Sequence, residues 1–122
     1  MKKLFLTKEE QEISSDIIDI LSVLIDERNW CKRALARDKE GNQLFNHEDP
    51  KAVKWDIYGT IYSLECNQVT IDFLRQRARL RGYSDLDRLN DLNEHFYLIS
   101  FLKECLNSFG LSFKVKMIGI NK

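Results

Sequence analysis

Four segments of this chain carry apolar residues at spacings of three and four, which is the pattern of a helix with one buried face. We expect these helices over residues 8–27, 50–64, 68–81 and 93–110. The first begins at Thr7, where a Thr-x-x-Glu capping box lets Thr7 and Glu10 each satisfy the backbone N–H of the other residue. The pattern predicts a mainly α protein with a four-helix core.

The second of these helices is expected to start at Asp49-Pro50. Aspartate is a favoured N-cap, and proline suits the first helical position because its missing N–H costs nothing there. Gly59 lies on the apolar side of the same segment, although glycine costs roughly 1 kcal/mol relative to alanine inside a helix. We therefore expect another stretch of backbone to cross closely at Gly59.

A small antiparallel β-sheet is expected beside the helices. Asp38 to Gly41 has the composition of a turn, and the residues on either side predict a hairpin over about 33–45. Apolar and polar side chains alternate strictly from residue 111, which predicts a C-terminal strand over 111–118 that pairs with the hairpin. The predicted fold class is therefore α+β, mainly α, and the edge of the last strand predicts a possible homodimer contact.

Length and composition limit the classes of protein. We expect one domain over residues 1–122, since this length supports a single hydrophobic core. Nineteen basic and nineteen acidic residues give a formal charge of zero, so no overall field attracts nucleic acid or an anionic membrane.

Three cysteines without a CxxC motif indicate reduced thiols. No apolar run is long enough for a signal peptide or a membrane span, which predicts a cytoplasmic protein with no membrane contact.

Basic residues alternate along the third expected helix, at Arg75, Arg77, Arg79 and Arg81. Alternate residues lie about 200° apart on a helix, so these side chains fall on different sides. Several acidic residues follow directly and can neutralise the arginines, which favours an ordinary solvated surface. They are Asp85, Asp87 and Asp91. The alternative is a phosphate-binding patch that also uses lysines of the C-terminal tail, as in a nucleic-acid-associated protein.

Three blocks of residues resemble an uncharacterised bacterial and phage domain family. The blocks are Trp30-Cys31 with Ala34 to Asp38 and Gly41, then Asp49-Pro50, Ala52-Val53, Trp55 and Gly59, and finally Leu89-Asn90-Asp91. Members of the family read approximately W-x-x-x-x-A-R-D-x-x-G, then D-P-x-A-V-x-W-x-x-x-G, then Asn-Asp before a final helix. This chain has Asp56 where the family usually has cysteine, and Thr60-Ile61 where it has Ala-Leu. The family has no established activity, so the resemblance implies an architecture and a set of marked positions but no reaction.

No residue pattern predicts a catalytic, metal or cofactor site. A thiol nucleophile would need Cys31 beside His47 or His95, but no local motif places these residues together, and cysteines are commonly buried and inert. A metal site would draw on residues 47–49, or on His95 with Asp91, and neither is a recognisable ligand cluster. The sequence therefore favours a protein without enzymatic activity, metal or cofactor.

Six residues of the matched blocks are the candidate binding site: Trp30, Arg37, Asp38, Trp55, Asn90 and Asp91. In one interpretation they form a polar cluster that links the hairpin to the helical core, with Arg37 in a bidentate pair with a carboxylate. In the other they form a ligand or partner site, because tryptophan and arginine are frequent at interaction hot spots.

The predicted function is a non-enzymatic interaction, accessory or regulatory protein of bacteria or phage, with an unknown protein partner. A first alternative is a nucleic-acid-associated protein that uses a local basic patch. A second is a small-molecule-binding or hydrolytic protein with a site around Arg37, Asp38 and Trp55.

Overall fold

The computed structural model describes residues 5–113. In this part of the chain the helices are α1 (Lys8–Leu24), the 3₁₀ helix η1 (Glu27–Asn29), α2 (Ile57–Ser63), α3 (Gln68–Leu80), α4 (Leu86–Asp91) and α5 (His95–Asn107). The strands are β1 (Ala36–Arg37), β2 (Gln43–Leu44) and β3 (Lys54–Trp55). The prediction of a mainly α, α+β fold is confirmed. None of the described helices is both long and apolar enough to cross a membrane.

Helix α1 is the element around which the others pack, since it contacts α2, α3 and α5. Its expected capping box is present: Thr7 N donates to Glu10 Oε1 over 2.9 Å, and Glu10 N donates to Thr7 Oγ1 over 3.1 Å. Burying an aliphatic side chain stabilises a fold by about 1.5–3 kcal/mol, and one face of α1 is almost entirely aliphatic. The fully buried residues of this face are Ile17, Ile20, Leu21 and Leu24.

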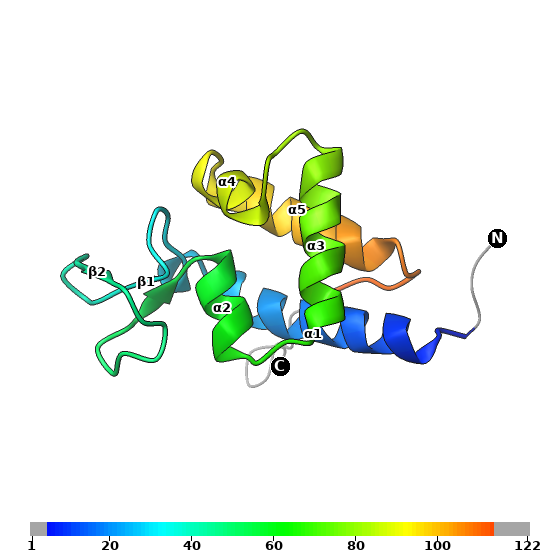
Figure 1. The fold of residues 1–122 in the computed structure, drawn as a ribbon, viewed down its shortest axis with the longest axis horizontal. Coiled ribbons are helices and arrows are strands. Elements are labelled where there is room, and N and C mark those ends of the chain that lie inside the picture. The colour runs from blue at the N-terminus through cyan, green and yellow to red at the C-terminus, as the bar shows by residue number, and fades with distance from the viewer. Residues whose placement is uncertain (1–4, 114–122) are drawn as a thin grey trace, which may run out of the picture.

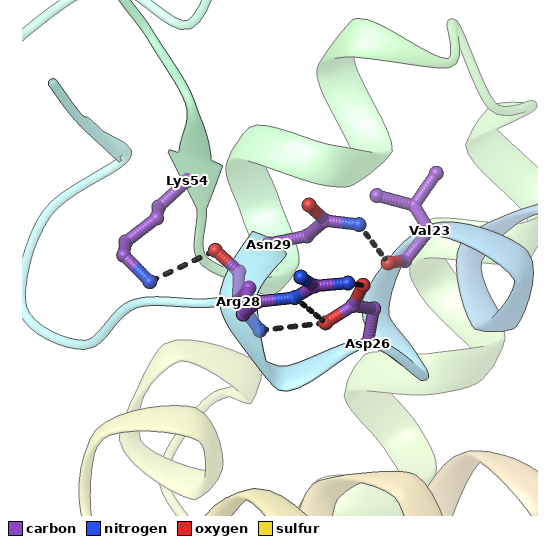
Figure 2. Close-up of polar contacts among 5 residues, drawn as sticks. All are labelled: Val23, Asp26, Arg28, Asn29 and Lys54. Carbon is purple, nitrogen blue, oxygen red and sulfur yellow. Dashed lines mark hydrogen bonds and ion pairs between the residues drawn. The ribbon is translucent and has the colours of Figure 1, made fainter. Parts of the chain in front are cut away.

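Helix α1 ends at Leu24, before the predicted boundary at residue 27. Asp26 explains the difference, because its Oδ1 accepts a hydrogen bond from Arg28 N (3.0 Å) and so starts η1. The guanidinium of Arg28 also pairs with the Asp26 carboxylate, with 2.8 Å between Nη2 and Oδ2 (Figure 2).

Hydrogen bonds join the turn after α1 to α1 itself and to strand β3. Asn29 Nδ2 donates to Val23 O (2.8 Å), and Lys54 Nζ, from β3, donates to Arg28 O (2.8 Å) (Figure 2). The end of α1 is thereby joined to the sheet through a side chain that lies far from it in the sequence.

The predicted second helix, residues 50–64, is wrong in its first half. Helix α2 covers only Ile57–Ser63. Its N-cap is Asp56, whose Oδ1 accepts a hydrogen bond from Gly59 N over 2.7 Å. The expected close crossing at Gly59 is confirmed, because a Cβ atom there would lie 2.1 Å from Leu35 O.

Residues 49–55 explain why the helix starts late. Asp49 caps a turn and not a helix, accepting a hydrogen bond from Lys51 N (2.9 Å). Residues 54–55 are extended and pair with β1 as β3, which no helical conformation allows. Val53 lies four residues before Ile57, at the spacing of one helix face, but its side chain is 44% exposed. The helical spacing was therefore accidental over these residues.

The sheet has the order β2-β1-β3, and both pairings are antiparallel. The predicted hairpin over about 33–45 is confirmed by β1 and β2. The third strand comes from β3 and not from the C-terminus: residues 111–113 are not in a strand, and residues 114–118 lie outside the described residues. The homodimer expected through that tail strand therefore stays a prediction.

Helix α3 agrees with its prediction, and α4 is a short helix in addition to the four that the sequence predicts. Helix α5 begins at His95 and not near Asn93. Asn93 lies before this start, and its Nδ2 donates to Leu89 O of α4 (2.8 Å).

Figure 1 shows the sheet at one side of the molecule, beside α2 and away from α3 and α5. We call residues 31–55, which include all three strands, the β lobe. Most of the buried core residues belong to the helices, so the β lobe is an extension that the helical core holds in place.

Candidate functional site

Asn90, in α4, is the polar centre of the junction between the β lobe and the helical core. Its side chain has no exposed surface. Its Oδ1 accepts hydrogen bonds from Trp30 Nε1 (2.8 Å) and from Ile57 N (3.1 Å), and its Nδ2 donates to Cys31 O (3.2 Å). One amide side chain thus joins α4, the start of α2 and the chain segment that enters the β lobe.

Asp91 continues this junction towards the surface. Its Oδ1 accepts from Asn90 Nδ2 (3.0 Å) and from Arg33 N (2.9 Å). Arg33 has φ of 63°, a left-handed conformation that an ordinary side chain rarely adopts. The hydrogen bond to Asp91 stabilises the chain in this bend.

Arg37 and Asp38 lie elsewhere, in the hairpin. Arg37 was expected to pair with a carboxylate, but its Nη1 donates to Gly41 O (2.9 Å) and its Nη2 to Lys32 O (3.0 Å). Asp38 Oδ1 accepts from Asn42 N (2.8 Å) and Glu40 N (3.0 Å), and the hydrogen bond from the Asn42 backbone is the main reason that the pKa of Asp38 is lowered. Both side chains are therefore used to close the turn between β1 and β2.

Trp55 is connected to both regions through its backbone. Its O accepts from Cys31 N (3.1 Å), and Trp30 and Trp55 form an isolated parallel bridge. Its indole Nε1 donates to His47 O (3.2 Å) and so holds the loop before β3.

The six predicted residues therefore form two sets and not one cluster. Trp30, Asn90 and Asp91 fasten the β lobe to the helical core. Arg37, Asp38 and Trp55 shape the β lobe from within. The contacts that the structure gives these side chains lie inside the chain, and a role in binding stays a prediction.

Asp56 was not among the candidate site residues that the sequence predicted. It is only 6% exposed, and burial raises its pKa to about 6, with the charges of Asp91 and Asp87 acting in the same direction. The hydrogen bond from Gly59 N opposes this rise. The signal was available in the sequence, since Asp56 stands where the resembled family usually has cysteine.

Asp56 leads to a prediction about stability and pH. The folded protein holds the pKa of Asp56 near 6, above the ordinary value of 3.8, so the folded state binds the proton more tightly than the unfolded chain. The stability contributed by the protonated group is present below pH 3.8 and is lost as the pH rises through about 6. Asp56→Asn keeps the acceptor oxygen and removes the charge. Its free energy of unfolding, measured in urea, should rise relative to the wild type by about 2 kcal/mol between about pH 4 and about pH 7.

Asp85→Asn is the matched control. Burial alone would raise the pKa of Asp85, but hydrogen bonds from Tyr58 (2.7 Å), the Leu86 backbone and Arg75 lower it. Its contribution to stability is therefore lost only as the pH falls below 3.8, and the Asp85→Asn difference should not rise over the same range. A constant difference between Asp56→Asn and the wild type would show that Asp56 ionises normally in the folded protein.

Burial disfavours the thiolate form of Cys31, the candidate nucleophile. The Cys31 thiol is buried and donates to Ala34 O (3.4 Å), and burial raises its pKa to about 12. His95, one of the two candidate bases, has its Nε2 within hydrogen-bond distance of Leu24 O (2.6 Å). In the part of the chain that the structure describes, no group of three or more His, Cys, Asp or Glu residues could hold a metal ion.

The arginines of α3 are partly paired, as expected for a mixed surface. Arg75 forms an ion pair with Asp85 (3.2 Å), and Arg81 pairs with Glu104 of α5. The guanidinium of Arg77 lies over the ring of Phe73, 5.1 Å from its centroid. These contacts leave a smaller free charge on α3 than the sequence alone indicates.

Comparison with known proteins shows a similarity to a bacterial protein. The chain is 32% identical over 93 residues to an uncharacterized protein of Bacillus anthracis. The aligned segment covers 75% of this chain but only 15% of that protein. No family model matches the chain, and no solved structure matches it. The similarity agrees with the resemblance to an uncharacterised bacterial domain.

Proposed function

We propose that this chain is a non-enzymatic interaction module of bacteria or phage that presents its β lobe to a partner protein. The observation that carries the proposal is the exposure of large apolar side chains on a lobe that extends from the helical core. Phe45 is 83% exposed and Val53 is 44% exposed. These side chains give the β lobe apolar surface that a partner protein would bury.

The shape of the β lobe supports the same proposal. A hollow of about 570 Å³ lies between the hairpin turn and the loop before β3, lined in part by Asp38, Pro50 and Val53. The exposed side chain of Val53 lines this hollow together with charged and polar residues, so a partner that fills the hollow would contact Val53.

The six candidate residues take positioning roles in this proposal. Trp30, Asn90 and Asp91 hold the β lobe on the core, and the hydrogen bonds of Arg37 and Asp38 keep the hairpin in one conformation. Trp55 holds the loop that carries Pro50 and Val53 through its hydrogen bond to His47 O.

The wider setting is also part of the proposal. The similar segment is a small part of a much longer bacterial protein, which supports a module that can be combined with other segments. All three cysteines are free thiols, which supports a reducing compartment such as the cytoplasm. The α3 arginines that are paired within the chain favour a protein partner over nucleic acid.

The test is affinity capture from the native host, with Phe45→Ser compared with the wild type by quantitative mass spectrometry. At least one host protein should be captured by the wild type and should fall about tenfold or more with Phe45→Ser, since a buried aromatic anchor commonly supplies 2 kcal/mol or more at an interface. Phe45 is almost fully exposed, so the substitution should leave the free energy of unfolding unchanged within about 0.5 kcal/mol.

Phe96→Ser is the control, because Phe96 is 74% exposed on α5, away from the β lobe. It should leave the captured proteins unchanged. Equal capture by Phe45→Ser and the wild type, or a loss that only Phe96→Ser produces, would reject the β lobe as the interaction surface.

A further inference from the structure

A second surface hollow lies where the segment 33–35 meets α2 and α4. This groove has about 510 Å³ of accessible space, and its lining shares no residue with the hollow on the β lobe. One wall is apolar and aromatic: Leu35, Tyr58 and Tyr62. The Tyr58 and Tyr62 rings stack with centroids 5.7 Å apart and 27° between their planes. Tyr62 is 43% exposed, so part of this aromatic wall is accessible to a ligand.

The other wall carries three aspartate side chains from two parts of the chain. Asp56 precedes α2, and Asp87 and Asp91 belong to α4. Asp87 forms no hydrogen bond or ion pair with any described residue, so its carboxylate is available. Burial raises the pKa of Asp56, and the nearby charges of Asp91 and Asp87 raise it further, because like charges disfavour the ionised form.

The charge of the groove is unbalanced. Arg33 is the basic residue in its lining, against three aspartates. The guanidinium of Arg33 forms no ion pair with the described carboxylates, and the contact between Arg33 and Asp91 runs through the backbone N–H. The groove therefore combines a partly exposed aromatic ring, Tyr62, with an excess of negative charge.

We propose that this groove binds an arginine side chain from a basic segment of a partner protein. A planar guanidinium can pack against the exposed part of the Tyr62 ring, which also contacts Tyr58 and His47, and donate two parallel hydrogen bonds to one carboxylate, which an ammonium group cannot do. A metal ion would use the carboxylates alone and leave the aromatic wall without a role, and these carboxylates do not form a metal-binding group. Asp87 supplies the accessible carboxylate, and Asp56 adds negative potential from within the wall.

This inference names the chemistry of a partner and so rests on the proposed interaction function, but it concerns a second hollow, where the β lobe meets α2 and α4. The two tests can therefore fail separately: capture through the β lobe is measured with Phe45→Ser, and binding at the groove is measured with a peptide and no host protein.

The experiment is a titration of the full chain, labelled with ¹⁵N, with a short Gly/Ser peptide that carries one central arginine. Amide shifts should concentrate at Arg33, Tyr58, Tyr62 and Asp87, and the peptide with citrulline in place of arginine should produce none at the same concentration. A central lysine should bind more weakly than arginine. Asp87→Asn should weaken the arginine peptide about fivefold, since one accessible ion pair contributes up to about 1 kcal/mol.

Asp19→Asn, an exposed carboxylate on α1, is the matched control and should bind as the wild type does. Equal binding of the citrulline peptide, an unchanged affinity in Asp87→Asn, or shifts centred outside the groove would overturn the proposal. Free argininamide or magnesium ions that bind as tightly as the peptide would also overturn it, because the site would then take a small cation and not a protein segment. Asp87 has no partner in the described fold, so loss of folding does not confuse the result.

Discussion

Replacing Asn90 with alanine should lower the free energy of unfolding by about 3–5 kcal/mol. The side chain is fully buried, and its removal leaves Trp30 Nε1, Ile57 N and Cys31 O without the partners that the structure gives them. Each buried polar group left without a partner costs about 1–3 kcal/mol. The loss can be measured by urea unfolding followed by tryptophan fluorescence, and Trp30 reports directly on this junction.

Asn107→Ala is the control for this substitution. Asn107 is the exposed last residue of α5, and the same chemical change there should alter stability by less than about 0.5 kcal/mol. A loss of less than about 1 kcal/mol in Asn90→Ala would mean that Trp30 and Ile57 find other partners, and Asn90 would then not be the centre of the junction.

The helices that the sequence predicted best are those whose caps and apolar spacing agree. Helix α1 has a true capping box at Thr7 and Glu10, and α3 is followed by Gly82 with φ of 97°, which suits glycine. The second helix failed because Asp49-Pro50 is equally compatible with a turn. Strand β3 pairs with β1 through contacts between distant residues, and spacing along one segment contains no information about such pairing.

The sequence identified the six candidate residues but did not predict how they are arranged. Trp30 and Asn90 are 60 positions apart, so their hydrogen bond could be suspected only because both belong to the matched blocks. Arg37 was expected to pair with a carboxylate, but its guanidinium donates to the backbone carbonyl groups of Gly41 and Lys32. Asp56 was missed because its role depends on burial, and burial at this position follows from the late start of α2.

Replacing Gly59 with alanine should destabilise the protein by roughly 3 kcal/mol, although alanine favours a helix by about 1 kcal/mol. The added Cβ would lie 2.1 Å from Leu35 O and 3.3 Å from Asp56 Oδ1. Backbone cannot move aside as a flexible side chain can, so the segment before β1 would be displaced from α2. That segment also accepts the hydrogen bond from Asp56 N at Leu35 O (3.3 Å), which the displacement would break. The loss can be measured by urea unfolding, and hydrogen exchange at Asp56 N should become faster.

Gly110→Ala separates this steric effect from the general cost of replacing a glycine. Gly110 has φ of 79°, but a Cβ there would meet no atom within 4 Å, so only backbone strain of about 1 kcal/mol is expected. If Gly59→Ala were no more damaging than Gly110→Ala, the added Cβ atom would not clash with Leu35 O. The backbone of Leu35 would then have to lie farther from α2 than the 2.1 Å distance to the Cβ position implies. A larger loss at Gly59 would mean that the same close approach fixes both the start of α2 and the base of the β lobe. The groove between α2, α4 and residues 33–35 depends on that approach, because these segments form its walls.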